Sequence, residues 1–212
     1  MDVTLTTILY QPDWSRTGPI IDQNLAALGA CGHSGELLIV DNSPMPTIPA
    51  LELAARDDRV RLLWNDGHNL YIAGALNRVL RVAQSPKLVY FCASHGLARD
   101  PTWLNDILMP LDDPAVGAAG CVLPCQFSAV AAVPEDIVDP QHHVQGGVWS
   151  ARLDVLREIG FSHRFPFEFC DVDLSRRLLA AGYQLASTAT IVSVAGGVIP
   201  DPERYKYVHD YR

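Results

Sequence analysis

The feature that most constrains the fold is a series of short apolar runs that alternate with segments of helical periodicity. Near-continuous apolar strands separated by helices favour a mostly parallel sheet covered on both faces, so we expect an α/β fold. The strands expected in the first half are 3–10, 36–40, 60–64 and 87–92, and the expected helices are 17–28, 72–82 and 103–109.

The second half of the sequence is less regular but continues the alternation. Extended runs are expected at 117–123, 144–150 and 184–194, a proline-containing loop at 125–140, and helices at 152–159 and 173–181. The chain has 212 residues, a length that suits one domain. We expect that domain over residues 1–200 and a polar, aromatic tail over 201–212.

The composition excludes several functions. Sixteen Lys and Arg stand against 24 Asp and Glu, giving a net charge of −8, whereas a general nucleic-acid binder needs a basic face. No apolar run approaches the roughly 18–20 residues that span a bilayer, and no signal peptide is visible. The five cysteines are an odd, scattered set, which we interpret as reduced thiols of a cytoplasmic protein. Cys121 and Cys125 lack the further ligands of a zinc site.

Polar residues follow the ends of the expected strands. In parallel sheets, ligands bind outside the carboxyl ends of the strands. Gln11, Asp41 and the pair Ser94 and His95 all occupy such positions. The Asp41 carboxylate could bind the ribose or base of a nucleotide, or it could close an Asx-turn. His95 could touch a ligand or be structural.

Two further clusters carry candidate chemistry. Asn69 precedes a helix and Asn77 lies within it, so both could reach a ligand or serve capping and packing. In residues 167–174, a carboxylate among aromatic side chains would have a raised pKa and could act as a general base. Asp171 is the better candidate, because Asp173 is expected to cap the following helix or to pair with Arg176 or Arg177.

Taken in order, these clusters resemble family 2 glycosyltransferases of the GT-A fold, closest to bacterial rhamnosyltransferase-like members. The resemblance covers residues 3 to about 197. Its elements are V-D-N-x-S at 40–43, N-x-G-[FY]-x-x-[GA]-x-N at 69–77, P-x-W-L at 101–104, a glycine pair at 146–147 followed by Arg152, and E-D-x-D-L-x-x-R-x-x-x-x-G-[YF] at 170–183. Tyr71 stands where the second element usually has glycine.

The resemblance implies a hexosyltransferase that moves a sugar from a nucleotide-diphosphate donor to an acceptor hydroxyl with inversion. It implies a nucleotide-binding half at about 1–100 and an acceptor half at about 101–200, with Asp171 as the catalytic base. The implied donor-binding residues are Gln11, Asp41, Asn69, Asn77, Ser94 and His95. The implied acceptor-binding residues are Gly146, Gly147, Trp149 and Glu168. The expected partners are a nucleotide-sugar and a small-molecule or glycan acceptor.

The sequence departs from this family at the metal site. The carboxylates of the D-x-D motif are replaced by Ser94, His95 and Gly96, and Cys170 stands in place of the glutamate of E-D. A hard cation such as Mn²⁺ or Mg²⁺ prefers carboxylate oxygens. We therefore expect weak or no metal dependence, with His95 as the one possible metal contact and with His95 or Arg99 supplying positive charge. The alternative is an inactive GT-A-fold module that binds a nucleotide, a sugar or a partner protein.

A nucleotidyltransferase on a related sheet is a third interpretation. Such an enzyme is disfavoured because Gln11, Pro12 and Asp13 follow the first expected strand, where a basic, glycine-rich loop would be needed. The sequence likewise contains neither of the common phosphate-binding loops nor a serine hydrolase motif.

Overall fold

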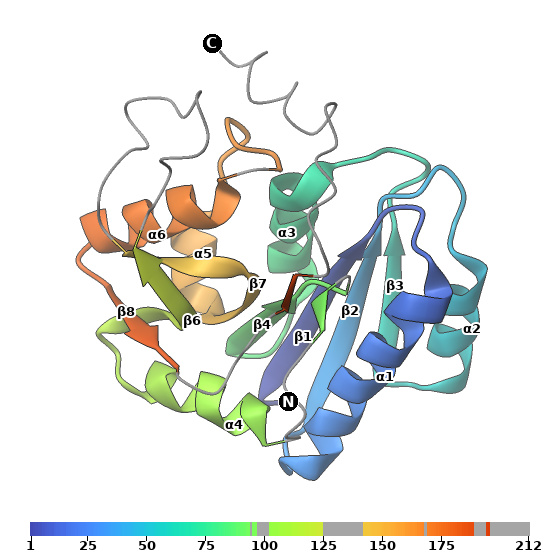
Figure 1. The fold of residues 1–212 in the computed structure, drawn as a ribbon, viewed down its shortest axis with the longest axis horizontal. Coiled ribbons are helices and arrows are strands. Elements are labelled where there is room, and N and C mark those ends of the chain that lie inside the picture. Colours follow the sequence, from blue (N-terminus) through green and yellow to red (C-terminus); the bar gives the residue numbers. More distant parts are fainter. Residues whose placement is uncertain (94, 97–101, 125–141, 168, 189–193, 196–212) are drawn as a thin grey trace.

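The apolar runs form one seven-stranded sheet with the order β3-β2-β1-β4-β7-β6-β8, seen in the computed structural model (Figure 1). The structure describes residues 1–93, 95–96, 102–124, 142–167, 169–188 and 194–195. Strand β7 is antiparallel to both β4 and β6, and the other strands of this sheet run parallel to one another. The strands are β1 (Val3–Leu9), β2 (Gly35–Asp41), β3 (Val60–Trp64), β4 (Lys87–Phe91), β6 (Val116–Pro124), β7 (His142–Arg152) and β8 (Gln184–Ser187).

Helices cover both faces of the sheet, as the apolar strands predicted. One apolar cluster joins the sheet to α1 (Trp14–Ala30), α2 (Ile48–Arg56) and α4 (Trp103–Leu108). The other joins it to α3 (Tyr71–Val82), α5 (Leu153–Ile159) and α6 (Cys170–Ala180). Strand β2 supplies both clusters, since Leu37 and Ile39 face the first and Leu38 and Val40 the second.

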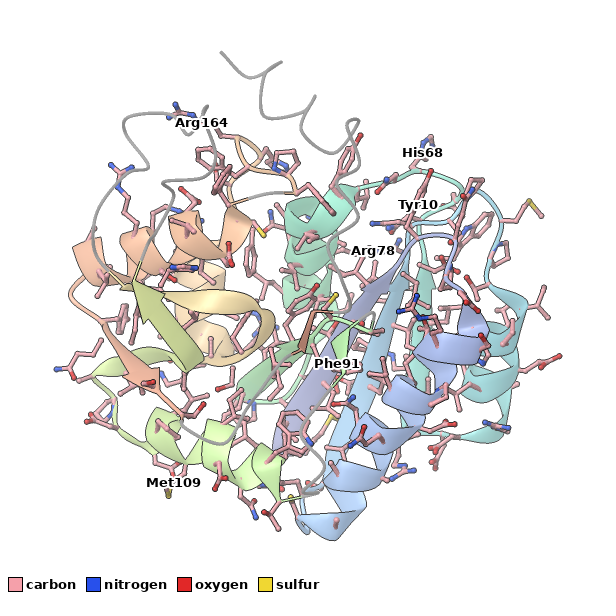
Figure 2. The ribbon with its side chains drawn as sticks, viewed as in Figure 1. Tyr10, His68, Arg78, Phe91, Met109 and Arg164 are labelled. Atoms are coloured by element: carbon pink, nitrogen blue, oxygen red, sulfur yellow. The ribbon has the colours of Figure 1, made fainter. Side chains whose placement is uncertain are left out.

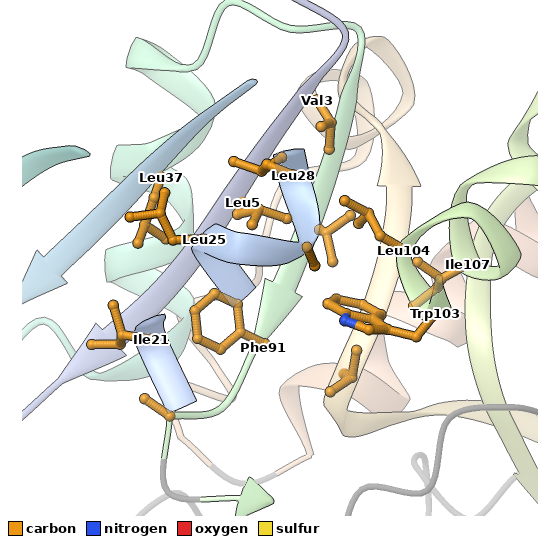
Figure 3. Packing of buried hydrophobic residues seen from close by; sticks show 14 of the residues in the cluster. Val3, Leu5, Ile21, Leu25, Leu28, Leu37, Phe91, Trp103, Leu104 and Ile107 are labelled. Atoms are coloured by element: carbon orange, nitrogen blue, oxygen red, sulfur yellow. The ribbon is translucent and has the colours of Figure 1, made fainter. Parts of the chain in front are cut away.

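The first cluster fixes the central strands beneath α1 and α4. Figure 3 shows Phe91 from β4 and Trp103 from α4 packed beside the leucines of α1. Phe91 and Trp103 are both almost fully buried. Burying a side chain of this size contributes about 1.5–3 kcal/mol or more, so these residues hold the carboxyl end of β4 in place.

Most expected elements of the first half are confirmed, and the structure differs from the expectations in three places. Helix α1 begins at Trp14 rather than Thr17, because the Asp13 side chain accepts a hydrogen bond from the Ser15 N–H at 3.1 Å and caps the helix. A 3₁₀ turn, Met109–Asp112, continues α4. Helix α2 was missed altogether, although Pro49 in its first turn is a helix-start signal.

The second half also follows the expected order. Strand β7 is longer than expected, and its register against β6 is interrupted. Gly120 faces Trp149, but Val122 faces Val144, so β7 advances five residues while β6 advances two. The additional residues form a bulge that contains Gly146 and Gly147.

The two halves of the expected domain share this one sheet, while its limits at 1–200 stay a prediction. The expected loop at 125–140 and the tail at 201–212 lie outside the described residues. Within the described part of the chain, no helix has both the length and the apolar character needed to cross a bilayer.

Candidate active site

The carboxyl ends of β1, β2 and β3 meet at one end of the sheet. Backbone and side-chain hydrogen bonds join their loops: the Gln11 N–H donates to Ser43 Oγ at 2.8 Å, and the Asn65 N–H donates to the Asp41 carbonyl at 3.1 Å. Figure 2 shows Tyr10 and Arg78 at this end of the sheet. Gln11 is exposed and has a left-handed backbone, with φ of 44°. Tyr10 is also exposed here, although the sequence pattern did not indicate it as a candidate site residue.

Asp41 organises the loop after β2. Its Oδ1 accepts from the Ser43 N–H at 2.9 Å and its Oδ2 from the Thr47 N–H at 2.6 Å, and the residue is 0% exposed. This is the Asx-turn alternative. Both oxygens of the Asp41 carboxylate are therefore engaged within the protein, and a direct donor contact by Asp41 stays a prediction.

A buried polar network lies behind that loop. The Asn42 side chain donates to the Tyr71 carbonyl at 3.2 Å and accepts a hydrogen bond from the side chain of Asn65. Asn65 in turn accepts from the guanidinium of Arg78, which also donates to the Trp64 carbonyl at 2.8 Å. The network connects β2 and β3 to α3, so it fixes where α3 begins.

The two asparagines of the 69–77 element both serve the backbone. Asn69 Oδ1 accepts from the Tyr71 N–H at 2.8 Å, at the start of α3. The Asn77 side chain makes two hydrogen bonds with Phe161, donating to its carbonyl at 2.8 Å and accepting from its N–H at 2.9 Å. These contacts are the capping and packing alternatives, and a donor contact by either residue stays a proposal.

Asp171 lies at the start of α6, next to the bulge of β7. The residue is half-buried, and its Oδ1 accepts from the Val172 N–H at 2.9 Å. Its backbone carbonyl accepts a hydrogen bond from the Ser175 hydroxyl at 2.7 Å. The same Ser175 Oγ accepts one from the Val144 N–H at 3.1 Å. The first turn of α6 is therefore tied to β7.

The surroundings of Asp171 favour a protonatable carboxyl. Burial raises its pKa above the ordinary value of 3.8, while the nearby His143 and the backbone N–H groups of Val172 and Gly146 lower it. Burial likewise raises the pKa of Tyr90, as do the neighbouring thiols of Cys92 and Cys170. A carboxylate with a raised pKa at the ligand-binding end of a sheet can accept a proton from a hydroxyl.

The local structure corrects the expected role of Asp173. The residue that caps α6 is Phe169, with φ of 62°, and Asp173 lies inside the helix. Asp173 instead pairs with Arg177 at 2.8 Å, as the second alternative predicted. Arg177 also donates to the carbonyls of Ile159 at 2.6 Å and Gly160 at 2.9 Å.

The Trp149 side chain lies in the core. It is 2% exposed and packs between Tyr90 and Phe161, with ring centroids 5.6 and 5.9 Å away. The expected acceptor contact by Trp149 is not tested by this packing and stays a prediction.

The position of the missing D-x-D motif is described by its backbone alone. His95–Gly96 form β5, which pairs antiparallel with β9 (Val194–Ala195), so His95 lies opposite Ala195. The His95 side chain, Ser94, Arg99 and Glu168 lie outside the description. Among the described residues, no three His, Cys, Asp or Glu side chains gather into a group that could hold a metal ion. Serine, histidine and glycine at this position do not fit a hard cation, which prefers carboxylates.

The sheet order and the helices on both faces define the class of the protein, which has the GT-A fold. A mannosyltransferase from Pyrobaculum calidifontis, solved with GDP-Man and Mn²⁺, matches it with a TM-score of 0.70 and 21% identity over 97% of this chain and 60% of its own. A CMP:2-keto-3-deoxy-manno-octonic acid synthetase, solved with CTP, matches with a TM-score of 0.57 and 12% identity over 99% of this chain and 98% of its own. The same fold therefore occurs in proteins with different names and ligands.

The chain also has a curated sequence relative. The O-antigen biosynthesis protein RfbC of Myxococcus xanthus is 29% identical in an alignment of 208 positions that covers 84% of this chain. The match spans 16% of the length of that relative, so this chain is similar to one segment of RfbC. No protein-family model matches the chain. Fold and relative together confirm the resemblance to glycosyltransferases of the GT-A fold.

Proposed function

We propose that this chain is an inverting glycosyltransferase that moves a hexosyl group from a nucleotide-diphosphate donor to the hydroxyl of a small molecule or glycan. The observation that carries the proposal is the half-buried Asp171 carboxyl, held beside the bulge of β7 in a GT-A fold. The mannosyltransferase from Pyrobaculum calidifontis, which shares the fold, and the relative named for O-antigen biosynthesis support the proposal.

The proposed reaction is a single in-line displacement. The acceptor oxygen attacks the anomeric carbon while its proton passes to the Asp171 carboxylate. The bond between the anomeric carbon and the diphosphate oxygen breaks, and its electron pair leaves with the nucleoside diphosphate. Attack on the face opposite the leaving group inverts the anomeric carbon, and the base accelerates this step by about 10²–10⁴-fold.

In the donor half, some residues are proposed to contact the donor directly and others to shape the loops around it. Tyr10 and Gln11 are exposed at the carboxyl end of β1 and are our choice for direct contact with the nucleoside. Asp41, Asn69 and Asn77 contribute by shaping the loops that surround it. Ser94 and His95 remain proposed contacts to the diphosphate, Gly147 and Glu168 proposed contacts to the acceptor, and cytoplasmic location an expectation from the cysteine usage.

We propose weak or no dependence on a divalent cation. The solved mannosyltransferase contains Mn²⁺, but the position of the expected carboxylates in this chain holds Ser94, His95 and Gly96. Without carboxylate ligands for a metal ion, the negative charge of the diphosphate leaving group would be neutralised by a cationic side chain. His95 and Arg99 are the candidates.

Donor binding is tested first, by thermal shift with UDP-, GDP-, dTDP- and CDP-sugars, each with manganese and with EDTA. Because a ligand that binds the folded state stabilises it, we expect one nucleotide class to raise Tm and the shift to survive EDTA. A shift that needs manganese would contradict the proposed metal independence.

Catalysis is tested with two matched substitutions two residues apart on α6. With the donor found above, release of nucleoside diphosphate should fall about 10²–10⁴-fold in Asp171→Asn, which cannot accept the proton. Asp173→Asn removes the pairing with Arg177 and should lower Tm while retaining turnover within a few fold. Equal activity of wild type and Asp171→Asn would remove Asp171 from the mechanism.

The pH profile gives a further check on the same assay. The base works only as a carboxylate, so kcat/KM falls as Asp171 becomes protonated. Because burial raises this pKa, the acidic limb should lie at higher pH than an exposed aspartate with a pKa of 3.8 would give. An acidic limb at or below that value would contradict the assignment.

A binding module without turnover is the second candidate. Cys170 at the position of the expected glutamate and the missing carboxylates at 94–96 favour it. A donor-dependent Tm shift without any release of nucleoside diphosphate would support this candidate over the enzyme.

A further inference from the structure

The Asp171 carboxyl packs against the backbone of Gly146, where a side chain would otherwise stand. A Cβ added to Gly146 would meet Asp171 Oδ2 at 2.8 Å and its Cγ at 3.4 Å. Side-chain carbons essentially never approach an oxygen at 2.8 Å, so the carboxyl occupies the space that a side chain at 146 would need.

Backbone groups on two elements hold the carboxyl there. The Val172 N–H, on α6, donates to Oδ1 at 2.9 Å, and the Gly146 N–H, on β7, donates to the same carboxyl group. The bulge of β7 brings Gly146 to this place, and its other end is fixed because the Gly147 carbonyl accepts from the Cys92 N–H at 2.8 Å.

We propose that Gly146 is a positioning residue for Asp171, and that its missing side chain makes room for the carboxyl rather than for a sugar. The inference rests on the proposed function in one respect, because it takes Asp171 as the base. It offers a different role from the acceptor contact that the family resemblance implies for Gly146.

The expected damage from a side chain at 146 is specific. The clashing atom is the end of a rotatable side chain, so the carboxyl turns away and the fold survives. Turning away breaks the hydrogen bonds from Gly146 and Val172 and moves the base from the acceptor hydroxyl. A displacement of about 1 Å at a reacting group can cost about 10²-fold in rate.

Kinetics of Gly146→Ala test the proposal, with release of nucleoside diphosphate as the readout. We expect kcat to fall about 10²-fold with donor KM within a few fold of wild type. The same substitution in an Asp171→Asn background should change the remaining rate less than about threefold, because Gly146 then has no base to position. A raised donor KM, or a full further loss in the Asp171→Asn background, would overturn the proposal in favour of a sugar contact.

A second readout does not need activity. Titration of the Asp171 carboxyl by ¹³C NMR should show a shifted pKa in Gly146→Ala, because the rotated carboxyl loses both its buried surroundings, which raise the pKa, and the Gly146 hydrogen bond, which lowers it. His143 on β7 and Tyr90 on β4 also interact electrostatically with this carboxyl, and Cys92 and Cys170 lie beside Tyr90; the substitution leaves all four in place. An unchanged pKa would overturn the proposal. If wild type releases no nucleoside diphosphate from any donor, the proposed function fails, and the titration still decides the role of Gly146.

Two controls complete the test. Gly29→Ala, in α1, adds a Cβ that meets nothing within 4 Å and should leave kcat unchanged. If Gly146→Ala does not fold, the double variant with Asp171→Ala removes the carboxyl and should fold. Failure of that double variant as well would contradict the steric contact on which the proposal depends.

Discussion

At the scale of single residues, Tyr71 combines a bulky side chain with a left-handed backbone. Its φ is 53° at the first residue of α3, a conformation that costs most residues about 1–2 kcal/mol. Glycine adopts this conformation without strain. The glycine that the family resemblance places at this position and the tyrosine found here therefore meet the same backbone requirement.

The backbone strain at Tyr71 predicts an inverted order of stability. Tyr71→Gly and Tyr71→Ala remove nearly the same side-chain atoms, but only alanine remains strained at φ of 53°. We expect Tyr71→Gly to be about 1 kcal/mol more stable than Tyr71→Ala in urea unfolding. In a right-handed helical position alanine is the more stable residue by about 0.5–1 kcal/mol, and that order would contradict the left-handed assignment.

At the scale of elements, Arg177 joins α6 to the end of α5. Its guanidinium reaches Asp173 and two carbonyls at the end of α5, those of its last residue Ile159 and of its C-cap Gly160. Lysine keeps the charge but cannot donate in three fixed directions. Arg177→Lys should therefore lower the free energy of unfolding by about 1–3 kcal/mol. Arg81→Lys, on the exposed face of α3, should change it by less than about 0.5 kcal/mol. Equal effects of the two substitutions would contradict this role.

Elements with strong apolar periodicity were predictable, and those formed by local contacts were not. The apolar runs that form β1 to β4 predicted the sheet, because the spacing of apolar residues along the sequence indicates which segments are buried strands. The start of α6 was misplaced because Phe169 caps it without a side-chain hydrogen bond. In the site, Asp171 was identifiable from its surroundings in sequence, whereas the roles of Asn77 and Trp149 depend on Phe161, which is distant in sequence.

At the scale of the whole molecule, a hydrogen-bonded seam joins the two halves of the chain. Along this seam Asn77 binds both backbone groups of Phe161, and the Pro166 carbonyl accepts from the N–H groups of Ile72 and Ala73 at 2.8 and 2.9 Å. The segment between Phe161 and Pro166 leads to α6 and Asp171. The position of the proposed base relative to the donor half therefore depends on this seam.

Loss of the Asn77 contacts should weaken the seam. Asn77→Ala leaves the N–H and carbonyl of the buried Phe161 without partners, so we expect a loss of about 2–3 kcal/mol in urea unfolding. The Phe161 amide should also exchange hydrogen faster. Asn105→Ala, which removes an exposed contact with His33, is the matched control and should cost less than about 1 kcal/mol. Equal costs would show that Asn77 is no more important than a surface residue.

The place of β7 in the sheet has a consequence for synthesis on the ribosome. Strands β1 to β4 can pair as soon as they emerge, because each joins a neighbour made earlier. The remaining edge of β4 is filled by β7, which starts at His142, while β4 ends at Phe91. At about 5–20 residues per second, the nascent sheet waits several seconds with that edge open. We expect a nascent chain halted in this interval to be the form most prone to chaperone capture or aggregation, because Tyr90 and Phe91 lie on the uncovered strand.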